Sequence, residues 1–131
     1  MSQAVKVLIV DDESTVQSII STFVTRYFDS KGMKCEIKTV SDPVQGLFVL
    51  NSHGSSFQII LLDVRLPKLT GDEIYNSLLH GDQNILDRVM FITGYPNDLL
   101  DRFPELTLNI LQKPFRYDDL KDKLEALMSS Q

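Results

Sequence analysis

The sequence is poor in the residues that build disulfides, zinc sites and membrane spans. Its 131 residues include a single cysteine, Cys35, two histidines and no tryptophan. One cysteine excludes an internal disulfide framework and a multi-cysteine zinc site. No apolar run approaches the roughly 18–20 residues of a membrane span, and the first residues lack the basic-then-apolar layout of a signal peptide. These absences predict a cytoplasmic protein that does not associate with membranes.

Positive charge is also scarce. Lys and Arg total 13 against 18 Asp and Glu, which gives a net charge of −5. Direct binding to nucleic acid needs a basic face, so the charge balance argues against that function. The apolar fraction of 43% and the charged fraction of 24% are typical of a folded globular protein. The length predicts a single domain over residues 1–131.

Strand and helix patterns alternate five times along the chain. Short apolar, β-branched segments predict strands at 5–10, 35–40, 57–62, 88–92 and 106–111. Helical spacing of apolar residues predicts helices at 14–28, from Pro43, from Thr70, at 98–103 and at 117–128. Strand–helix units with short connections predict parallel strands, and the fold class is therefore α/β.

Particular residues are expected to start the helices and to face the sheet. Ser14 and Gln17 form an S-x-x-Q capping box for the first helix. Asp42 precedes Pro43 as the N-cap of the second. The predicted inner faces include Ile19 and Ile20, then Val44, Leu47 and Phe48, then Ile74, Leu78 and Leu79, and finally Leu120, Leu124, Leu127 and Met128.

Polar side chains follow four of the predicted strands, at the sheet edge where ligands bind in such folds. They are Asp11, Asp12 and Glu13 after the first strand, Asp63 after the third, Thr93 after the fourth and Lys113 after the fifth. Acids placed this close together repel one another unless a cation compensates them. Oxygen ligands that leave room for water favour Mg²⁺ or Mn²⁺ over zinc.

A divalent cation and a lysine facing carboxylates would make a site for a phosphoryl group. Thr93 can donate a hydrogen bond to a phosphoryl oxygen. Asp63 can act as the nucleophile, because carboxylates form acyl phosphates. The residues themselves therefore predict metal-dependent phosphoryl transfer at this edge of the sheet.

Four motifs, in this order, resemble the receiver domain of two-component response regulators. They are V-D-D-E at 10–13, L-D-V-R-L-P-K-L-T-G at 62–71, I-T-G at 92–94 and Q-K-P-F at 112–115. The resemblance covers essentially the whole chain. It implies a flavodoxin-like, doubly wound, five-stranded parallel sheet of strand order 2-1-3-4-5 with five helices.

The resemblance also implies a role for each motif residue. Asp63 would be the phosphoacceptor, Thr93 would hydrogen-bond the phosphoryl group, and Lys113 would pair with it electrostatically. The Mg²⁺ (or Mn²⁺) ligands would be Asp11, Asp12, Asp63 and the backbone carbonyl of Arg65. The Lys113–Pro114 peptide bond would be cis.

The same resemblance implies the partners. The phosphodonor would be a sensor histidine kinase or a phosphotransfer protein. The phosphorylated chain would contact a downstream protein partner, or an output domain missing from this chain, which has no helix-turn-helix, methylesterase or cyclase segment. The chemistry would be self-phosphorylation with slow autodephosphorylation, so no enzyme that turns over an external substrate is expected.

Three other functions fit parts of the pattern. A phosphatase or phosphotransferase like the haloacid-dehalogenase group needs a second acid two residues after the nucleophile, where this chain has Arg65. A flavin or nucleotide carrier needs a glycine-rich loop, whereas the loop from Asp11 is acidic. A pseudo-receiver, which binds partners without phosphorylation, stays open because Ile110 stands where the family often carries an aromatic switch residue.

Arg65 is a second departure from the family pattern. A long cation beside the acids could contact the phosphoryl group or obstruct the attacking water. The alternative is that its side chain points into solvent. We expect Arg65 to alter the lifetime of the acyl phosphate, which dephosphorylation of Arg65→Ala measures against the parent. Equal rates would refute this.

Overall fold

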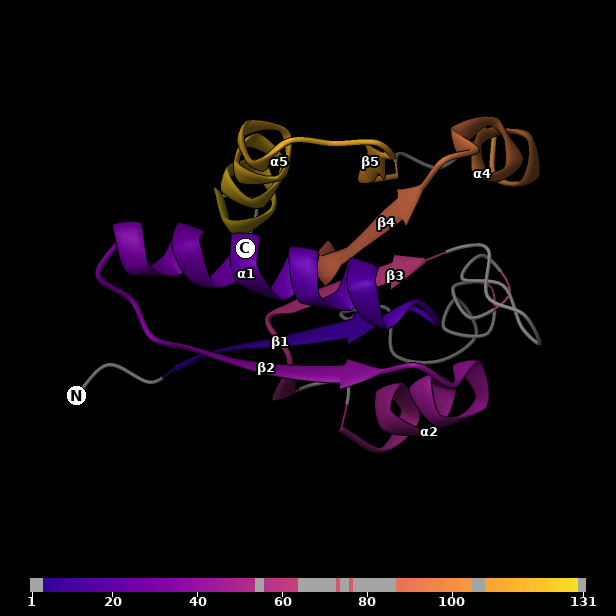
Figure 1. Ribbon diagram of the computed structural model, residues 1–131. Coiled ribbons are helices and arrows are strands. Elements are labelled where there is room, and N and C mark those ends of the chain that lie inside the picture. Colours follow the sequence, from indigo (N-terminus) through magenta and orange to yellow (C-terminus); the bar gives the residue numbers. More distant parts are fainter. Residues whose placement is uncertain are drawn as a thin grey trace.

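The computed structural model describes residues 4–53, 56–63, 73, 76, 87–104 and 108–129. Five parallel strands form one sheet in the order β2-β1-β3-β4-β5 (Figure 1). The strands are β1 (Val5–Val10), β2 (Cys35–Val40), β3 (Ile59–Asp63), β4 (Val89–Thr93) and β5 (Ile110–Gln112). The predicted sheet and its strand order are confirmed.

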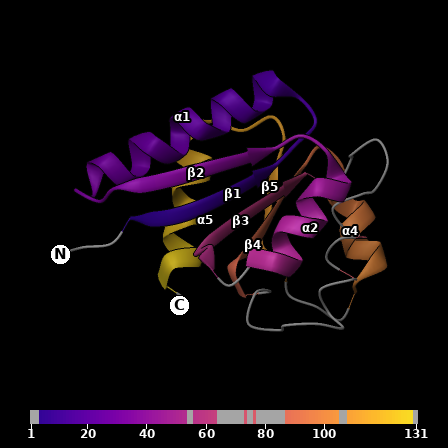
Figure 2. The same ribbon diagram turned by 90° about the horizontal axis from the view of Figure 1, so that it is seen from below.

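Four helices are present in the described residues: α1 (Ser14–Ser30), α2 (Pro43–His53), α4 (Pro96–Arg102) and α5 (Tyr117–Ser129). Helices α1 and α5 pack on one face of the sheet, and α2 and α4 pack on the other (Figure 2). The fifth predicted helix, from Thr70, falls almost entirely outside the described ranges, as do the inner-face residues predicted for it. Within these ranges, no helix has both the length and the apolar character of a membrane span.

The sheet separates two hydrophobic clusters. Successive side chains of a strand point to opposite faces, so β1 sends Leu8 and Val10 toward α2 and sends Val7 and Ile9 toward α1. Strands β3 and β4 are buried along their whole length. Burial on both faces explains why these segments are continuously apolar in the sequence.

Several strand bounds differ from the prediction. Strand β3 ends at Asp63 and β4 ends at Thr93, so each continues into its polar motif. Strand β5 comprises three residues instead of the predicted 106–111, because its pairs with β4 run only from Ile110 to Gln112. Leu108 and Asn109, which were predicted in this strand, precede it, and residues 106–107 lie outside the described residues.

The predicted capping box of α1 is wrong. Glu13 is the N-cap, and its side chain makes no capping hydrogen bond. Instead, Gln17 Nε2 donates to the carbonyl oxygen of Asp11 at 2.6 Å. The prediction for α2 is confirmed, because the Val44 amide donates to Asp42 Oδ1 at 3.0 Å. Helix α1 is therefore tied to the residue that follows β1 and not to its own first residue.

Three residues predicted to face the core are solvent-exposed. They are Ile19, Val44 and Phe48, with exposed fractions of 45%, 59% and 66%. Helix α2 turns its other side to the sheet and buries Val49 and Leu50, while Leu47 is partly buried. The stripe predicted for α5 is confirmed at Leu120, Leu124 and Leu127.

Gly46 allows α2 to approach β1 closely. A Cβ atom at this position would lie 3.0 Å from Val10 Cγ1. Alanine favours a helix over glycine by about 1 kcal/mol, but an overpacked core costs typically about 1–3 kcal/mol. We expect Gly46→Ala to lower the melting temperature measured by circular dichroism. Gly94→Ala, whose Cβ would meet nothing within 4 Å, is the control. A Gly46→Ala chain as stable as the parent would refute the close contact.

Candidate functional site

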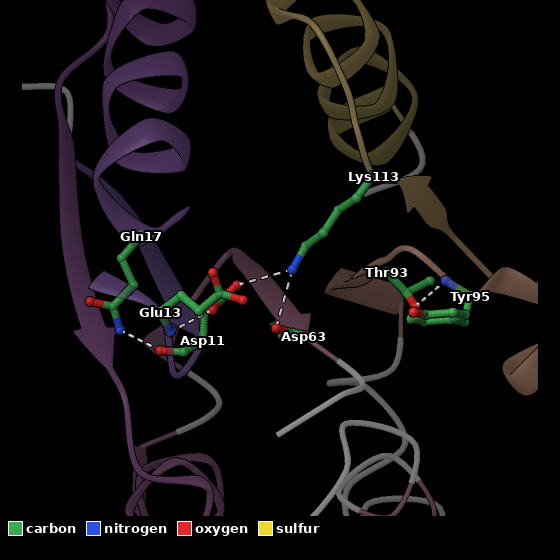
Figure 3. Close-up of polar contacts among 7 residues, drawn as sticks. All are labelled: Asp11, Glu13, Gln17, Asp63, Thr93, Tyr95 and Lys113. Carbon is green, nitrogen blue, oxygen red and sulfur yellow. Dashed lines mark hydrogen bonds and ion pairs between the residues drawn. The ribbon is translucent and has the colours of Figure 1, made fainter. Parts of the chain in front are cut away.

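The predicted site residues meet at the carboxyl end of the sheet (Figure 3). They come from four strands, with Asp11 after β1, Asp63 at the end of β3, Thr93 at the end of β4 and Lys113 after β5. The register between β1 and β3 pairs Val10 with Leu62, which makes Asp11 and Asp63 the next residues on neighbouring strands. The strand order therefore brings together residues that are far apart in the sequence.

The ammonium group of Lys113 contacts both buried carboxylates. Its Nζ lies 3.2 Å from Asp63 Oδ2 and 3.6 Å from Asp11 Oδ2 (Figure 3). Asp11 and Asp63 are only 1% and 3% exposed. Buried carboxylates that face each other need a positive partner to limit their repulsion. Lys113 supplies this positive charge. It follows β5, which lies on the other side of the central strand β3 from Asp11 and β1.

The backbone around Lys113 aims its side chain at the acids. The Lys113 amide donates to the Thr93 carbonyl at 2.7 Å, which fastens the end of β5 to β4. The peptide bond between Lys113 and Pro114 is cis, as predicted.

Two hydrogen bonds to backbone groups hold Asp11 in place. Its amide donates to the Val40 carbonyl at 3.0 Å, which extends the ladder between β1 and β2. Its Oδ1 accepts from the Glu13 amide at 2.9 Å. No described residue donates a hydrogen bond to its buried Oδ2, because Lys113 Nζ lies at an ion-pair distance. A buried oxygen without a donor is costly, and a bound cation would satisfy it.

Burial and charge shift the ionisation of two groups in the site. Burial raises the pKa of Asp11 to about 6; the charge of Asp63 raises it as well, although the Glu13 amide and Lys113 lower it. Burial lowers the pKa of Lys113, but Asp63 and Asp11 outweigh this effect and raise it above its usual value. Lys113 is therefore charged at neutral pH, and the site takes up a proton on Asp11 near pH 6.

Three carboxylates of the site can hold a divalent metal ion. Asp11, Asp12 and Asp63 each offer an oxygen, and these oxygens lie within 4.8 Å of one another. Asp12 is exposed while the other two are buried, so the group opens to solvent on one side. This donor set, together with the buried Oδ2 of Asp11, fits the predicted Mg²⁺ or Mn²⁺. Arg65, predicted to add its carbonyl oxygen, lies outside the described residues.

Thr93 is fully buried at the end of β4. Its Oγ1 accepts a hydrogen bond from the Tyr95 amide at 2.9 Å. Figure 3 shows Thr93 on the far side of Asp63 from Asp11. A hydroxyl oxygen that accepts one bond keeps its own hydrogen for donation. Thr93 is thus oriented by the backbone and can still act as a donor.

Sequence reasoning missed two contacts that shape the site. Gln17 was assigned to a capping box, and no local pattern indicates its bond to the Asp11 carbonyl. The bond from the Tyr95 amide to Thr93 could have been found, because a hydroxyl often accepts from the amide two residues later. Glu13, grouped with the acids after β1, is exposed and contributes its backbone amide to Asp11.

Comparison with known sequences places the chain among signalling proteins. A family model described as the response regulator receiver domain matches residues 7–125. Sporulation initiation phosphotransferase F of Bacillus subtilis is 27% identical over 125 residues, which are 94% of this chain and 93% of that protein. The transcriptional regulatory protein CpxR homolog of Haemophilus influenzae is 29% identical over 126 residues, and the match covers 94% of this chain. The chain spans about 50% of the length of this second relative.

Two solved receiver domains have a fold similar to that of this chain. A response regulator receiver domain protein from Clostridium thermocellum has a TM-score of 0.79 at 22% identity, covering 96% of this chain and 95% of that one. The receiver domain of a Pseudomonas aeruginosa sensor histidine kinase, solved with a magnesium ion in its active-site cleft, has a TM-score of 0.76 at 19% identity, covering 97% and 99%. At these identities the likeness concerns the fold, and it confirms the flavodoxin-like architecture.

Proposed function

The chain belongs to the response regulator receiver domain family of two-component signalling, and from this premise we propose that Asp63 accepts a phosphoryl group in a Mg²⁺-dependent reaction. One observation carries the proposal. Lys113 contacts the buried Asp63 carboxylate at 3.2 Å, beside two further carboxylates that can share a cation. A nucleophile, a fixed cation and a metal-binding group are the parts that phosphoryl transfer needs.

In the proposed reaction, a carboxylate oxygen of Asp63 attacks the phosphorus, and the bond from phosphorus to the donor atom breaks. Lys113 would pair with the phosphoryl oxygens, and the Thr93 hydroxyl would donate to one of them. Mg²⁺, held by Asp11, Asp12, Asp63 and the Arg65 carbonyl, would neutralise charge on the transferred group. Because Asp63 is 3% exposed, water has limited access to the acyl phosphate, which favours slow hydrolysis.

The partners follow from this role. Receiver domains as a class are phosphoacceptors that do not turn over an external substrate. We propose that the phosphodonor is a sensor histidine kinase or a phosphotransfer protein, in the cytoplasm. We propose that residues 1–131 act as one domain that switches contacts with a downstream protein or an output domain. The relative that is named a transcriptional regulator, about half of which this chain spans, supports the latter.

Ile110 favours a second candidate, a pseudo-receiver that binds partners without phosphorylation. Ile110 is partly buried against the cluster beneath α2 and α4. A β-branched side chain is stiff at χ1 and cannot swing as an aromatic ring would. Coupling between Thr93 and this position must therefore differ from that of a family member with an aromatic residue here.

Incubation with acetyl phosphate and Mg²⁺, followed by intact-mass measurement, separates the two candidates. We expect the parent to gain the mass of one phosphoryl group and Asp63→Asn to gain none. Asp122→Asn, which removes an exposed carboxylate on α5, is the matched control and should retain the gain. A folded parent chain that binds Mg²⁺ yet gains no mass would contradict the proposal and favour the pseudo-receiver.

A further inference from the structure

Strand β2 forms an edge of the sheet. In the part of the chain that the structure describes, it pairs only with β1. Figure 1 shows it as the outermost strand of the sheet, beside β1. An exposed strand edge is a template for pairing with another strand.

The hydrogen-bonding groups of β2 can be assigned to its two sides. The Lys34 carbonyl accepts from the Val5 amide at 2.9 Å, and the Val40 carbonyl accepts from the Asp11 amide at 3.0 Å. Backbone groups of successive strand residues alternate between the two sides, so the even-numbered residues face β1. The amides and carbonyls of Cys35, Ile37 and Thr39 therefore point outward, away from the sheet.

Two opposite charges border this open edge. Glu36 and Lys38 are exposed and stand on the same face of the strand, two residues apart. Both line an open hollow of about 480 Å³ that also includes Lys6. Among the described residues, no ion pair engages either charge. Glu36 and Lys38 are thus available to a partner that approaches the edge.

We propose that β2 pairs with β2 of a second copy of this chain, as antiparallel strands related by a two-fold axis at Ile37. In this register Glu36 lies opposite Lys38 of the second copy, and Lys38 lies opposite its Glu36. The outward amide of Ile37 donates to the Ile37 carbonyl of the second copy, and the second copy returns the same bond. Cys35 and Thr39 of the second copy exchange amide-to-carbonyl bonds in the same way. This register therefore forms two opposite-charge pairs. It also gives hydrogen-bond partners to the outward amides and carbonyls of three residues per chain.

Other antiparallel registers either place like charges opposite each other or leave more of β2 unpaired. An axis at Glu36 or at Lys38 would place that charge opposite its own copy, which is destabilising. An axis at Cys35 or at Thr39 would leave much of the six-residue strand beyond the end of its partner. The self-complementary arrangement of Glu36 and Lys38 around Ile37 is the feature that selects a second copy of this chain as the occupant.

The proposed dimer leaves the phosphoacceptor site open. Because the two sheets run antiparallel, their carboxyl edges lie at opposite ends of the joined sheet. Each phosphoacceptor site then opens to solvent, on the side of the exposed Asp12, away from the β2 contact. Dimer formation and phosphorylation are therefore separable, and the failure of one proposal does not imply failure of the other.

Sedimentation velocity over a range of concentrations, with a charge swap, tests the proposal. We expect the parent to dimerise reversibly with a dissociation constant below about 1 mM, as is typical of a small interface. Glu36→Lys and Lys38→Glu should each weaken the dimer by about tenfold or more, because two attractive pairs become repulsive. The double variant Glu36→Lys/Lys38→Glu should restore it. Lys121→Glu, on the exposed side of α5, is the control for a general charge effect.

Two results would overturn the proposal. One is a parent that stays monomeric near about 1 mM; the other is a double variant that dimerises no better than the single ones. Hydrogen exchange gives a second readout of the geometry, because the outward Ile37 amide should gain protection as the concentration rises. The parent and the charge variants should all be phosphorylated by acetyl phosphate at the same rate.

Discussion

Replacement of Lys113 by methionine is expected to slow phosphorylation of Asp63 by about 10²–10³-fold, the range found when a single group that stabilises the transition state is removed. Methionine keeps the length and the apolar stem of the side chain but removes the charge. In the described residues, Lys113 is the cation that contacts both Asp11 and Asp63. Without the ammonium group, the negative charge that develops on the phosphoryl group is repelled by both carboxylates. The transition state is then less stable and the transfer is slower.

The rate is measured by intact mass at intervals after addition of acetyl phosphate and Mg²⁺. Lys121→Met serves as the control, because Lys121 is exposed on α5 and should give the parent rate. Circular dichroism establishes that the Lys113→Met chain is folded. Phosphorylation of this variant at nearly the parent rate would show that the ammonium group takes no part in the transfer.

Replacement of Asp11 by asparagine should make the metal-free chain more stable. Burial raises the pKa of Asp11 from 3.8 to about 6, so the folded chain holds an extra proton between these values. Stability therefore falls as the pH rises from about 4 to about 6, and the full cost is present above pH 6. Asparagine carries no charge and can still accept the Glu13 amide through Oδ1. We expect a gain of about 1–3 kcal/mol at pH 7.

Urea unfolding with and without Mg²⁺ measures this effect. The gain of Asp11→Asn over the parent should shrink as the pH is lowered from 7 toward about 3, below both pKa values, where Asp11 is mostly protonated in the folded and the unfolded chain. Added Mg²⁺ should stabilise the parent much more than the variant, because the variant has lost a buried ligand. Asp122→Asn is the surface control. An Asp11→Asn chain that is less stable than the parent in Mg²⁺-free buffer at pH 7 would contradict the prediction. It would show that the ionised Asp11 carboxylate does not destabilise the folded chain.

The sheet was predictable because its strands carry strong local signals. Strands β3 and β4 are buried throughout, and such strands appear as continuous apolar runs. Strand β2 alternates exposed and partly buried residues, as expected at an edge. The placement of Asp63 and Thr93 followed from the same signals, since each ends a strand whose position was known.

The wrong predictions concern the inner face of α2 and the role of Gln17. In both cases the sequence fits more than one arrangement, and tertiary packing selects one of them. In α2, apolar residues occur on more than one side, and periodicity favoured Val44 and Phe48. The helix instead turns Gly46 toward Val10, where a Cβ would lie at 3.0 Å. The spacing of apolar residues does not include glycine, so it cannot predict which side of the helix lies closest to the sheet. Likewise, Gln17 fits a capping box by spacing, and only the path of the chain after β1 brings it to the Asp11 carbonyl.

The site was predictable in its membership but not in its electrostatics. The rule that ligands bind beyond the carboxyl ends of strands brought Asp11, Asp63 and Lys113 together. The sequence could not indicate that Asp11 and Asp63 are buried while Asp12 is exposed. The raised pKa of Asp11 depends on this burial, which arises only when the surrounding elements pack.

Peptide-level mass spectrometry of the phosphorylated chain tests most directly whether the buried carboxylate at the end of β3 accepts phosphorus. The chain is treated with acetyl phosphate and Mg²⁺, digested at low pH and fragmented to locate the added group. We predict a single phosphoryl group on Asp63 that hydroxylamine removes, as it does an acyl phosphate. A phosphoryl group on Asp11, Asp12 or a histidine, with Asp63 unmodified, would contradict the account.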